Sequence, residues 1–158
     1  MGTEIEHKYL VKSVDFLEGL KGKKIEQGYI SNTTERSVRV RRKGAKAYLT
    51  IKGAAKGISR AEFEYEIPVE DAQALLADHC DGGIISKTRY EIEVAGKLWE
   101  VDVFEGDNIG LVVAEIELAR EDEAFELPEW AGEQVSHDER YLNAYLSLHP
   151  YKTWGQDR

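Results

Sequence analysis

The sequence predicts a mainly β protein of the α+β class, in which an antiparallel sheet is flanked by a few helices. Seven or eight segments alternate polar and apolar residues, short turns join most of them, and few stretches show helical spacing. Such a sheet either stacks on itself or closes into a barrel. With 158 residues, 42 % of them hydrophobic, we expect a single domain over residues 1–158.

Composition narrows the classes of function. Cys80 is the only cysteine, which excludes an internal disulfide and a zinc site built on several thiolates. The net charge of −9 argues against nucleic acid as a partner, although a concave site can differ from the surface average. No apolar run approaches the roughly 20 residues needed to span a bilayer, and the N-terminus has no signal-peptide pattern. We therefore expect a cytoplasmic protein without a membrane partner.

Residues 3–11 predict a strand whose two faces differ. Glu4, Glu6 and Lys8 project from one face, while Ile5 and Tyr9 project from the other, because side chains alternate along a strand. An edge strand with a solvated polar face would show the same pattern. However, charges at a spacing of two, with apolar residues between them, return at least four more times.

The first half of the chain is expected to continue with two helices and four strands. Ser13 precedes the helical spacing of Phe16 and Leu20, and Gly44 lies in the turn of a hairpin. Pro68 ends the last of these strands, because proline cannot donate to the hydrogen-bond ladder. The helices are expected over residues 13–20 and 69–80, and the strands over residues 25–31, 37–42, 48–52 and 59–68.

The second half is expected to return to strands after Gly82 and Gly83, which end the second helix. Pro128 indicates a turn or short helix over residues 124–131, and the spacing of Tyr141 and Tyr145 predicts a C-terminal helix over residues 138–148. Residues 150–158 are expected to form an irregular end. The strands are expected over residues 85–94, 98–104 and 111–118.

The charged strand faces carry like charges side by side. Like charges at neighbouring positions of a face repel, so a sheet selected for stability alone would mix the signs more evenly. The pairs are Arg39 with Arg41, Glu62 with Glu64, Lys87 with Arg89, and Glu115 with Glu117. We interpret these faces as the lining of a lumen that binds a ligand, with water and ions compensating for the burial of charge.

The residue types in this lumen indicate the ligand. The carboxylate pairs Glu4/Glu6 and Glu115/Glu117 supply hard oxygen ligands, which suit Mg²⁺ or Mn²⁺ better than zinc. Guanidinium and ammonium groups suit phosphate oxygens. The complementary ligand is a short polyphosphate with a divalent metal ion.

Six ordered motifs resemble the CYTH family, the triphosphate tunnel metalloenzymes. They are Glu4-x-Glu6-x-Lys8, Val38-Arg39-Val40-Arg41-Arg42-Lys43, Tyr48-Leu49-Thr50-Ile51-Lys52-Gly53, Arg60-x-Glu62-x-Glu64, Lys87-x-Arg89 and Glu115-Ile116-Glu117. The resemblance implies an eight-stranded antiparallel β-barrel that forms a charged tunnel. Residues 138–143 are similar to a family segment that helps to plug one tunnel mouth, with Glu139 and Leu142 as departures.

The resemblance also implies roles for individual residues. The metal ligands are Glu4, Glu6, Glu115 and Glu117, with Asp102, Glu62 and Glu64 as second-metal or water-orienting groups. The phosphate ligands are Lys8, Arg39, Arg41, Lys52, Lys87 and Arg89. Tyr29 lies where some short bacterial members have a tyrosine that acts with the motif lysine, here Lys8.

The implied reaction is the Mg²⁺- or Mn²⁺-dependent hydrolysis of inorganic triphosphate to pyrophosphate and phosphate, because the sequence has no separate aromatic pocket for a base. Alternatives are a class IV adenylyl cyclase, a nucleoside or thiamine triphosphatase, and a non-catalytic polyphosphate or nucleotide sensor. The apolar outer face of the barrel must be covered by the helices or by a second subunit, so a homodimer is one expectation.

Overall fold

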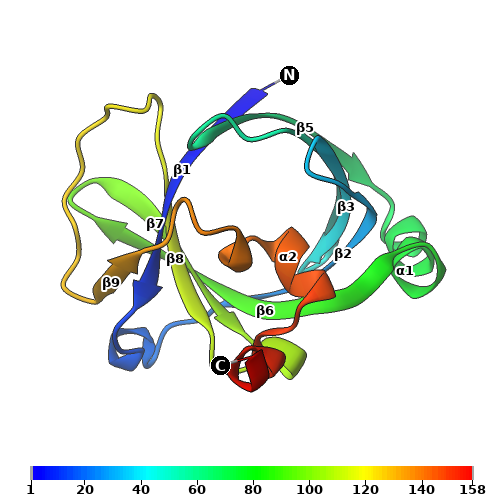
Figure 1. Ribbon diagram of the computed structural model, residues 1–158. Coiled ribbons are helices and arrows are strands. Elements are labelled where there is room, and N and C mark those ends of the chain that lie inside the picture. Colours follow the sequence, from blue (N-terminus) through cyan, green and yellow to red (C-terminus); the bar gives the residue numbers. More distant parts are fainter. Residues whose placement is uncertain (1, 158) are drawn as a thin grey trace.

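The computed structural model describes residues 2–157. Nine strands form one antiparallel sheet that curls into a ring (Figure 1). The strand order is β5-β4-β3-β2-β6-β7-β8-β1-β9. The strands are β1 (Gly2–Val11), β2 (Lys23–Asn32), β3 (Arg36–Lys43), β4 (Lys46–Gly53), β5 (Ser59–Ile67), β6 (Asp81–Val94), β7 (Lys97–Phe104), β8 (Val112–Glu117) and β9 (Ala131–Gln134).

The ring closes because the first half of β1 pairs with β5, with Gly2 opposite Glu62 and Ile5 opposite Ser59. The second half of β1 pairs with β8 on its other side, so β1 to β8 form a closed barrel. β9 lies outside the closed ring and pairs with the end of β1. The predicted eight-stranded antiparallel barrel is therefore confirmed.

The outer face of the barrel is covered by apolar packing. Trp99 and Ile116 are fully buried on the outside of β7 and β8. Phe125 and Trp130, from the long connection between β8 and β9, pack over them. The helix α1 (Val69–Asp78) covers Val40 and Ala47 elsewhere on the wall. Figure 1 shows α1 on the outside of the ring.

One end of the barrel interior is also apolar. Ile85, Phe104 and Val113 project inward from β6, β7 and β8, and they pack around Leu146 of α2 (Asn143–Leu148), which is 1 % exposed. Figure 1 shows α2 inside the ring. The C-terminal segment therefore plugs one end of the barrel through α2, which directly follows residues 138–142 of the segment that the resemblance indicated. The charged part of the lumen lies beyond this plug.

The structure differs from the expected elements at several places. Gly82 and Gly83, which were expected to end the second helix, lie in β6, because α1 already ends at Asp78. The expected helix over residues 13–20 is only a 3-10 turn at Asp15–Leu17, and Gly19 follows it with a φ of +82° that an α-helix cannot contain. The helix expected over 138–148 is divided, because Leu142 is extended (φ −73°, ψ 138°) between a 3-10 turn at Glu139–Tyr141 and α2. β9 was not predicted.

The C-terminal residues also differ from the expectation. They were expected to be irregular over 150–158, but Tyr151–Asp157 form a 3-10 helix, and Trp154 packs against Tyr141 and Tyr151. Arg158 lies outside the described residues. No helix in the described part of the chain is both long and apolar enough to cross a bilayer.

Candidate active site

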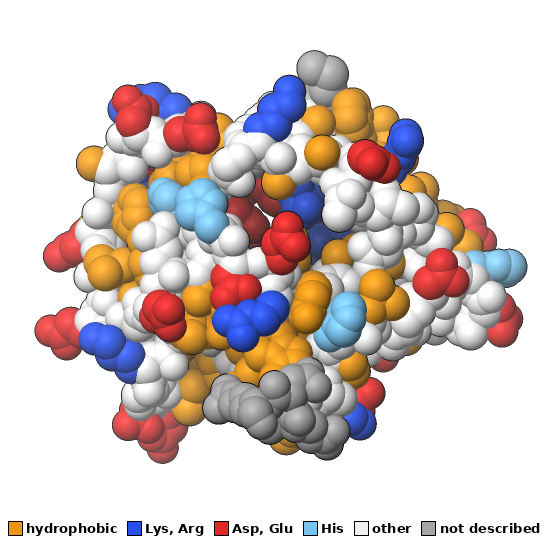
Figure 2. Space-filling view, viewed as in Figure 1, with side chains coloured by type: hydrophobic (Ala, Val, Ile, Leu, Met, Phe, Trp, Pro, Cys, Tyr) orange, Lys and Arg blue, Asp and Glu red, His pale blue; other side chains and the backbone are white. Residues whose placement is uncertain are grey.

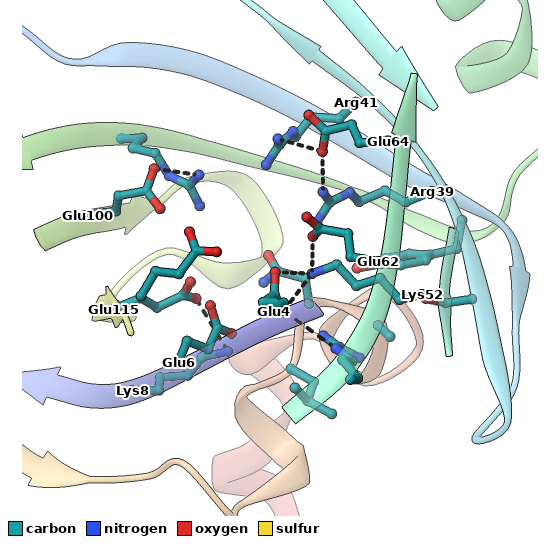
Figure 3. A pocket seen from close by; sticks show the side chains of 18 of the residues that line it. Glu4, Glu6, Lys8, Arg39, Arg41, Lys52, Glu62, Glu64, Glu100 and Glu115 are labelled. Carbon is teal, nitrogen blue, oxygen red and sulfur yellow. Dashed lines mark hydrogen bonds and ion pairs between the residues drawn. The ribbon is translucent and has the colours of Figure 1, made fainter. Parts of the chain in front are cut away.

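The charged faces meet in a cavity of about 230 Å³ inside the barrel. Every site residue predicted from the sequence lines this cavity except Asp102. Figure 3 shows Arg39, Arg41 and Lys52 on one wall, with Glu115 and Glu100 on the opposite wall. The barrel brings these side chains together because each lies on the inward face of its strand.

An ion pair between Glu4 and Lys52 joins the carboxylates of the cavity to the wall that carries Arg39, Arg41 and Lys52, which we call the basic wall. Lys52 Nζ donates hydrogen bonds to both carboxylate oxygens of Glu4, at 3.0 and 2.9 Å, and Arg60 Nε lies 3.5 Å from Glu4 Oε1. Burial raises the pKa of Glu4, but Lys52 and the other neighbours lower it to about 2. Glu4 is therefore a carboxylate that two cations hold in its charged form.

A second ion pair joins Lys8 and Glu115. Lys8 Nζ lies 3.4 Å from Glu115 Oε1 and donates a hydrogen bond of 3.0 Å to the carbonyl oxygen of Tyr141. Burial lowers the pKa of Lys8, but Glu115 and Glu6 outweigh this effect and raise it. Burial likewise opposes ionisation of Glu115, yet Lys8 and Arg89 hold the pKa of Glu115 well below its usual range.

Glu6 has the opposite environment. Burial and the nearby charges of Glu115 and Glu4 raise the pKa of Glu6 well above its usual value. Glu117 also has a raised pKa, caused by burial and by Glu4. These carboxylates have more negative charge around them than the neighbouring lysines neutralise. A divalent cation would relieve that repulsion, and carboxylate oxygens are the ligands that Mg²⁺ and Mn²⁺ prefer.

The predicted metal ligands are not assembled around a common point. Within residues 2–157, no group of three or more His, Cys, Asp or Glu side chains has the arrangement of a preformed metal site. Glu4 and Glu115 are instead engaged by Lys52 and Lys8. The donor set fits a hard divalent cation in its chemistry, and these lysines would have to release oxygens to it.

Asp102 does not lie where a metal ligand was expected. It is 2 % exposed and lies outside the residues that line the cavity. Arg89 donates to both of its oxygens, at 2.7 and 2.9 Å, and Lys87 Nζ lies 2.7 Å from Oδ2. This position of Asp102 fits an anchor that holds two cations predicted to bind phosphate at the cavity wall better than it fits a metal ligand.

Lys87 is held from two sides. Its Nζ also donates a hydrogen bond of 3.0 Å to Asn143 Oδ1 of α2, and Asn143 itself lines the cavity. Burial lowers the pKa of Lys87 to about 8, and Arg89 adds to this effect while Asp102 opposes it. The plug helix therefore helps to position a cation whose charge depends on pH near neutrality.

Glu62 and Glu64 lie on the basic wall. Glu64 accepts a hydrogen bond of 3.1 Å from Thr50 and lies 3.5 Å from Arg41. Glu62 lies 3.6 Å from Lys52, and burial together with Glu4 raises the pKa of Glu62. The structure therefore places both carboxylates beside cations that are predicted to bind phosphate.

Tyr29 lines the cavity with 5 % of its surface exposed, and burial raises the pKa of its hydroxyl. The hydroxyl therefore stays protonated near neutral pH and is available as a hydrogen-bond donor. Lys8 lines the same cavity, so Tyr29 and Lys8 face one space.

Seven lining residues were not among the predicted site residues, and three of them form ion pairs or side-chain hydrogen bonds with predicted ones. Arg60 contacts Glu4, Glu100 Oε2 lies 3.1 Å from Arg89 Nη1, and Asn143 contacts Lys87. Arg60 and Glu100 share the inward parity of their strands, so the alternation of the sequence contained a signal for both. Asn143 had no such signal, because its contact depends on how α2 enters the barrel.

Comparisons with known proteins agree with this fold. A family model described as the CYTH domain matches residues 2–145. The chain is 47 % identical to an inorganic triphosphatase of Acetivibrio thermocellus, over 98 % of this chain and 99 % of that relative. It is 38 % identical to an inorganic triphosphatase of Nitrosomonas europaea, over 92 % and 97 % of the two chains.

The fold has a similar solved structure. The crystal structure of the inorganic triphosphatase NE1496 aligns with a TM-score of 0.67 and 35 % identity, covering 94 % of this chain and 96 % of the other. The similarity therefore extends over nearly the full length of both chains.

Proposed function

The chain belongs to the CYTH domain family, and on that basis we propose that it hydrolyses inorganic triphosphate to pyrophosphate and orthophosphate. The observation that carries the proposal is the cavity in which buried lysines and arginines face clustered carboxylates. The names of the two relatives support the same reaction. A water molecule attacks the terminal phosphorus, the anhydride P–O bond breaks, and pyrophosphate leaves with the bonding electron pair.

The cations of the cavity bind and orient the phosphates in this proposal. Arg39, Lys52, Lys87 and Arg89 are each at most 9 % exposed, so water screens their charges little. Arginine offers two parallel donors to a phosphate, and lysine acts as a point charge. Fixed positive charge also stabilises the charge that develops on the phosphate oxygens during transfer, and the site is already organised to supply it.

We propose that a divalent metal ion, Mg²⁺ or Mn²⁺, is required, with Glu4, Glu6, Glu115 and Glu117 as its ligands. When bound, such an ion neutralises phosphate oxygens and polarises the phosphorus. The mutual repulsion that raises the pKa of Glu6 supports this assignment, because the carboxylates lack a full complement of positive charge. Glu6→Gln and Glu117→Gln are expected to raise the metal concentration needed for half-maximal activity.

The remaining polar groups serve the water and the substrate. Glu62 has a raised pKa and lies beside Lys52, so we assign it to orient the attacking water and accept its proton. Glu64 holds Arg41 in place. Tyr29, which stays protonated, donates a hydrogen bond to a phosphate oxygen from the wall of the cavity.

The test measures phosphate release from inorganic triphosphate, ATP and pyrophosphate, each with Mg²⁺, Mn²⁺ or EDTA. Rapid release from triphosphate alone, abolished by EDTA, is the expected result. Tight triphosphate binding without any release would contradict the proposal and leave a binding protein. Formation of cyclic AMP from ATP would contradict it in favour of a cyclase.

We also propose a cytoplasmic location and a homodimer. The apolar side chains of Ile51 and Tyr65, 36 % and 58 % exposed on β4 and β5, support a second subunit on that part of the outer wall. Cell fractionation and light scattering test these two points. Enrichment with membranes would contradict the location, and a monomer at micromolar concentration would contradict the dimer.

A further inference from the structure

A basic pocket opens beside the charged cavity. It has a volume of about 190 Å³ and is lined by Lys21, Lys23, Lys43, Arg89 and Glu91. Lys43 and Arg89 also line the central cavity, so the two spaces share part of their wall. Four of the five lining residues are cations, in a protein whose net charge is −9.

The strands connect this pocket to the phosphate-binding residues. On β3 the inward positions are Arg39, Arg41 and Lys43 in succession, because alternate side chains share a face. On β2, Lys23 lies opposite Arg89 of β6. Cations therefore continue without a break from the centre of the cavity to the rim of the barrel.

The basic run Lys21, Lys23 and Lys24 is divided between two environments. Lys24 Nζ lies 2.8 Å from Glu105 Oε1, and this ion pair is exposed. Lys21 and Lys23 line the basic pocket instead, and no ion pair within the described residues involves either of them. Their charge is therefore available to an incoming anion.

The opposite end of the barrel suits an anion less well. Leu146 and its apolar neighbours occupy part of that end. Figure 2 looks onto this end and shows an opening that remains beside the plug. The adjoining pocket there, of about 280 Å³, is lined by four acids, with Arg60 and His137 as its basic residues; the acids are Glu4, Glu6, Asp138 and Glu139.

A third pocket next to the cavity is also acidic. It is lined by Glu100, Glu117 and Glu123, and its lysine, Lys97, forms an ion pair with Glu123. A polyanion approaching this pocket or the plugged end therefore meets carboxylates first, and like charges repel. Of the three pockets, the one lined by Lys21 and Lys23 has the charge that matches the substrate.

We propose that the triphosphate enters the cavity through this basic pocket, and that Lys21 and Lys23 attract it there without taking part in the reaction. The inference rests on the proposed function, since it assumes a polyanionic substrate. A cleft lined by charge of one sign raises the local concentration of an oppositely charged ligand, and salt weakens the effect. The two lysines thus offset the repulsion from the protein's net negative charge.

The test compares two double variants with the same change in charge. Lys21→Glu/Lys23→Glu alters the basic pocket, and Lys12→Glu/Lys56→Glu alters two exposed lysines outside it. Phosphate release from inorganic triphosphate is measured at low and high ionic strength. For the first variant we expect kcat/KM to fall by about tenfold at low salt, with kcat unchanged and the difference reduced at high salt. The second variant is expected to stay within about twofold of the wild type.

The outcomes separate this inference from the proposed function. Wild-type protein that releases no phosphate from triphosphate would overturn both. A wild type that is active, with equal losses in the two double variants, would overturn the entrance alone, because net charge would explain the effect. The variant Glu91→Gln removes the acid of the basic pocket and is expected to raise kcat/KM at low salt by about twofold; a fall would contradict the proposal.

Discussion

The two faces of β7 and β8 serve different purposes within a few ångströms of each other. Trp99 and Ile116 point outward into an apolar cluster, while Glu100 and Glu115 point inward to the cations of the cavity. Adjacent residues of one strand thus contribute either to stability or to the site. The alternation of side chains along a barrel strand can therefore assign stability to one face and the reaction to the other. Four predictions test how independent the two faces are.

The largest effect is expected on the outer face. Trp99→Ala removes a fully buried indole that contacts Tyr9, Phe125 and Trp130, so we expect the free energy of unfolding to fall by about 3–5 kcal/mol. Chemical denaturation measures this loss. The kcat of the remaining folded protein should stay near the wild-type value. A large fall in the kcat of the fully folded variant would show that the two faces are coupled.

A slightly smaller effect is expected on the inner face. Lys87→Met removes a cation that is 2 % exposed while Asp102 keeps both hydrogen bonds from Arg89. We expect kcat/KM for triphosphate to fall by about 10²–10³-fold, as for the loss of one preorganised charge in an active site. The midpoint of denaturation should change little. Near-normal activity would remove Lys87 from the phosphate site.

The third effect concerns how kcat/KM depends on pH through Lys87. It should be small at neutral pH and grow as the solution becomes alkaline. Because burial lowers the pKa of Lys87 to about 8, the free enzyme loses this positive charge as the pH rises through that value. We expect kcat/KM, which reports the free enzyme, to fall by about tenfold per pH unit above it. Lys87→Arg should keep its charge and move the alkaline fall to higher pH. An unchanged alkaline limb would assign the titration to another group.

The smallest effect is expected at an exposed position of the outer wall. Tyr65→Lys replaces a side chain that is 58 % exposed, so the free energy of unfolding of a monomer should change by at most about 0.5 kcal/mol. Activity should be unchanged. If the wild type is a dimer through this wall, light scattering should instead show that the variant dissociates. A dimer unaffected by the change would place the interface elsewhere.

The inward and outward sets of side chains could be predicted from the sequence because a strand has a period of two. Glu4, Arg39, Lys52 and Glu115 were each identified from parity and charge, and each lines the cavity. The existence of most strands followed from the same pattern. β9 escaped prediction because its four residues are too few to show an alternation above chance.

Depth along the barrel could not be predicted from the sequence. Glu100 and Asp102 lie on the same face of β7, but their surroundings differ. Glu100 lines the cavity, whereas Asp102 does not and is paired with Arg89 and Lys87. Parity specifies a face but not the stagger of one strand against the next. That stagger decides which carboxylate reaches the lumen and which one anchors a neighbour.

The sequence by itself therefore determined strands with one charged face, and the cations and carboxylate clusters on that face, because alternation is a local property of each strand. The tertiary structure decided that α2 enters the barrel beside Lys87, that Asp102 is an anchor, and that Lys21 and Lys23 line a pocket next to the cavity. The physical reason is that these three features join segments distant in sequence, and only closure and stagger of the sheet bring them together.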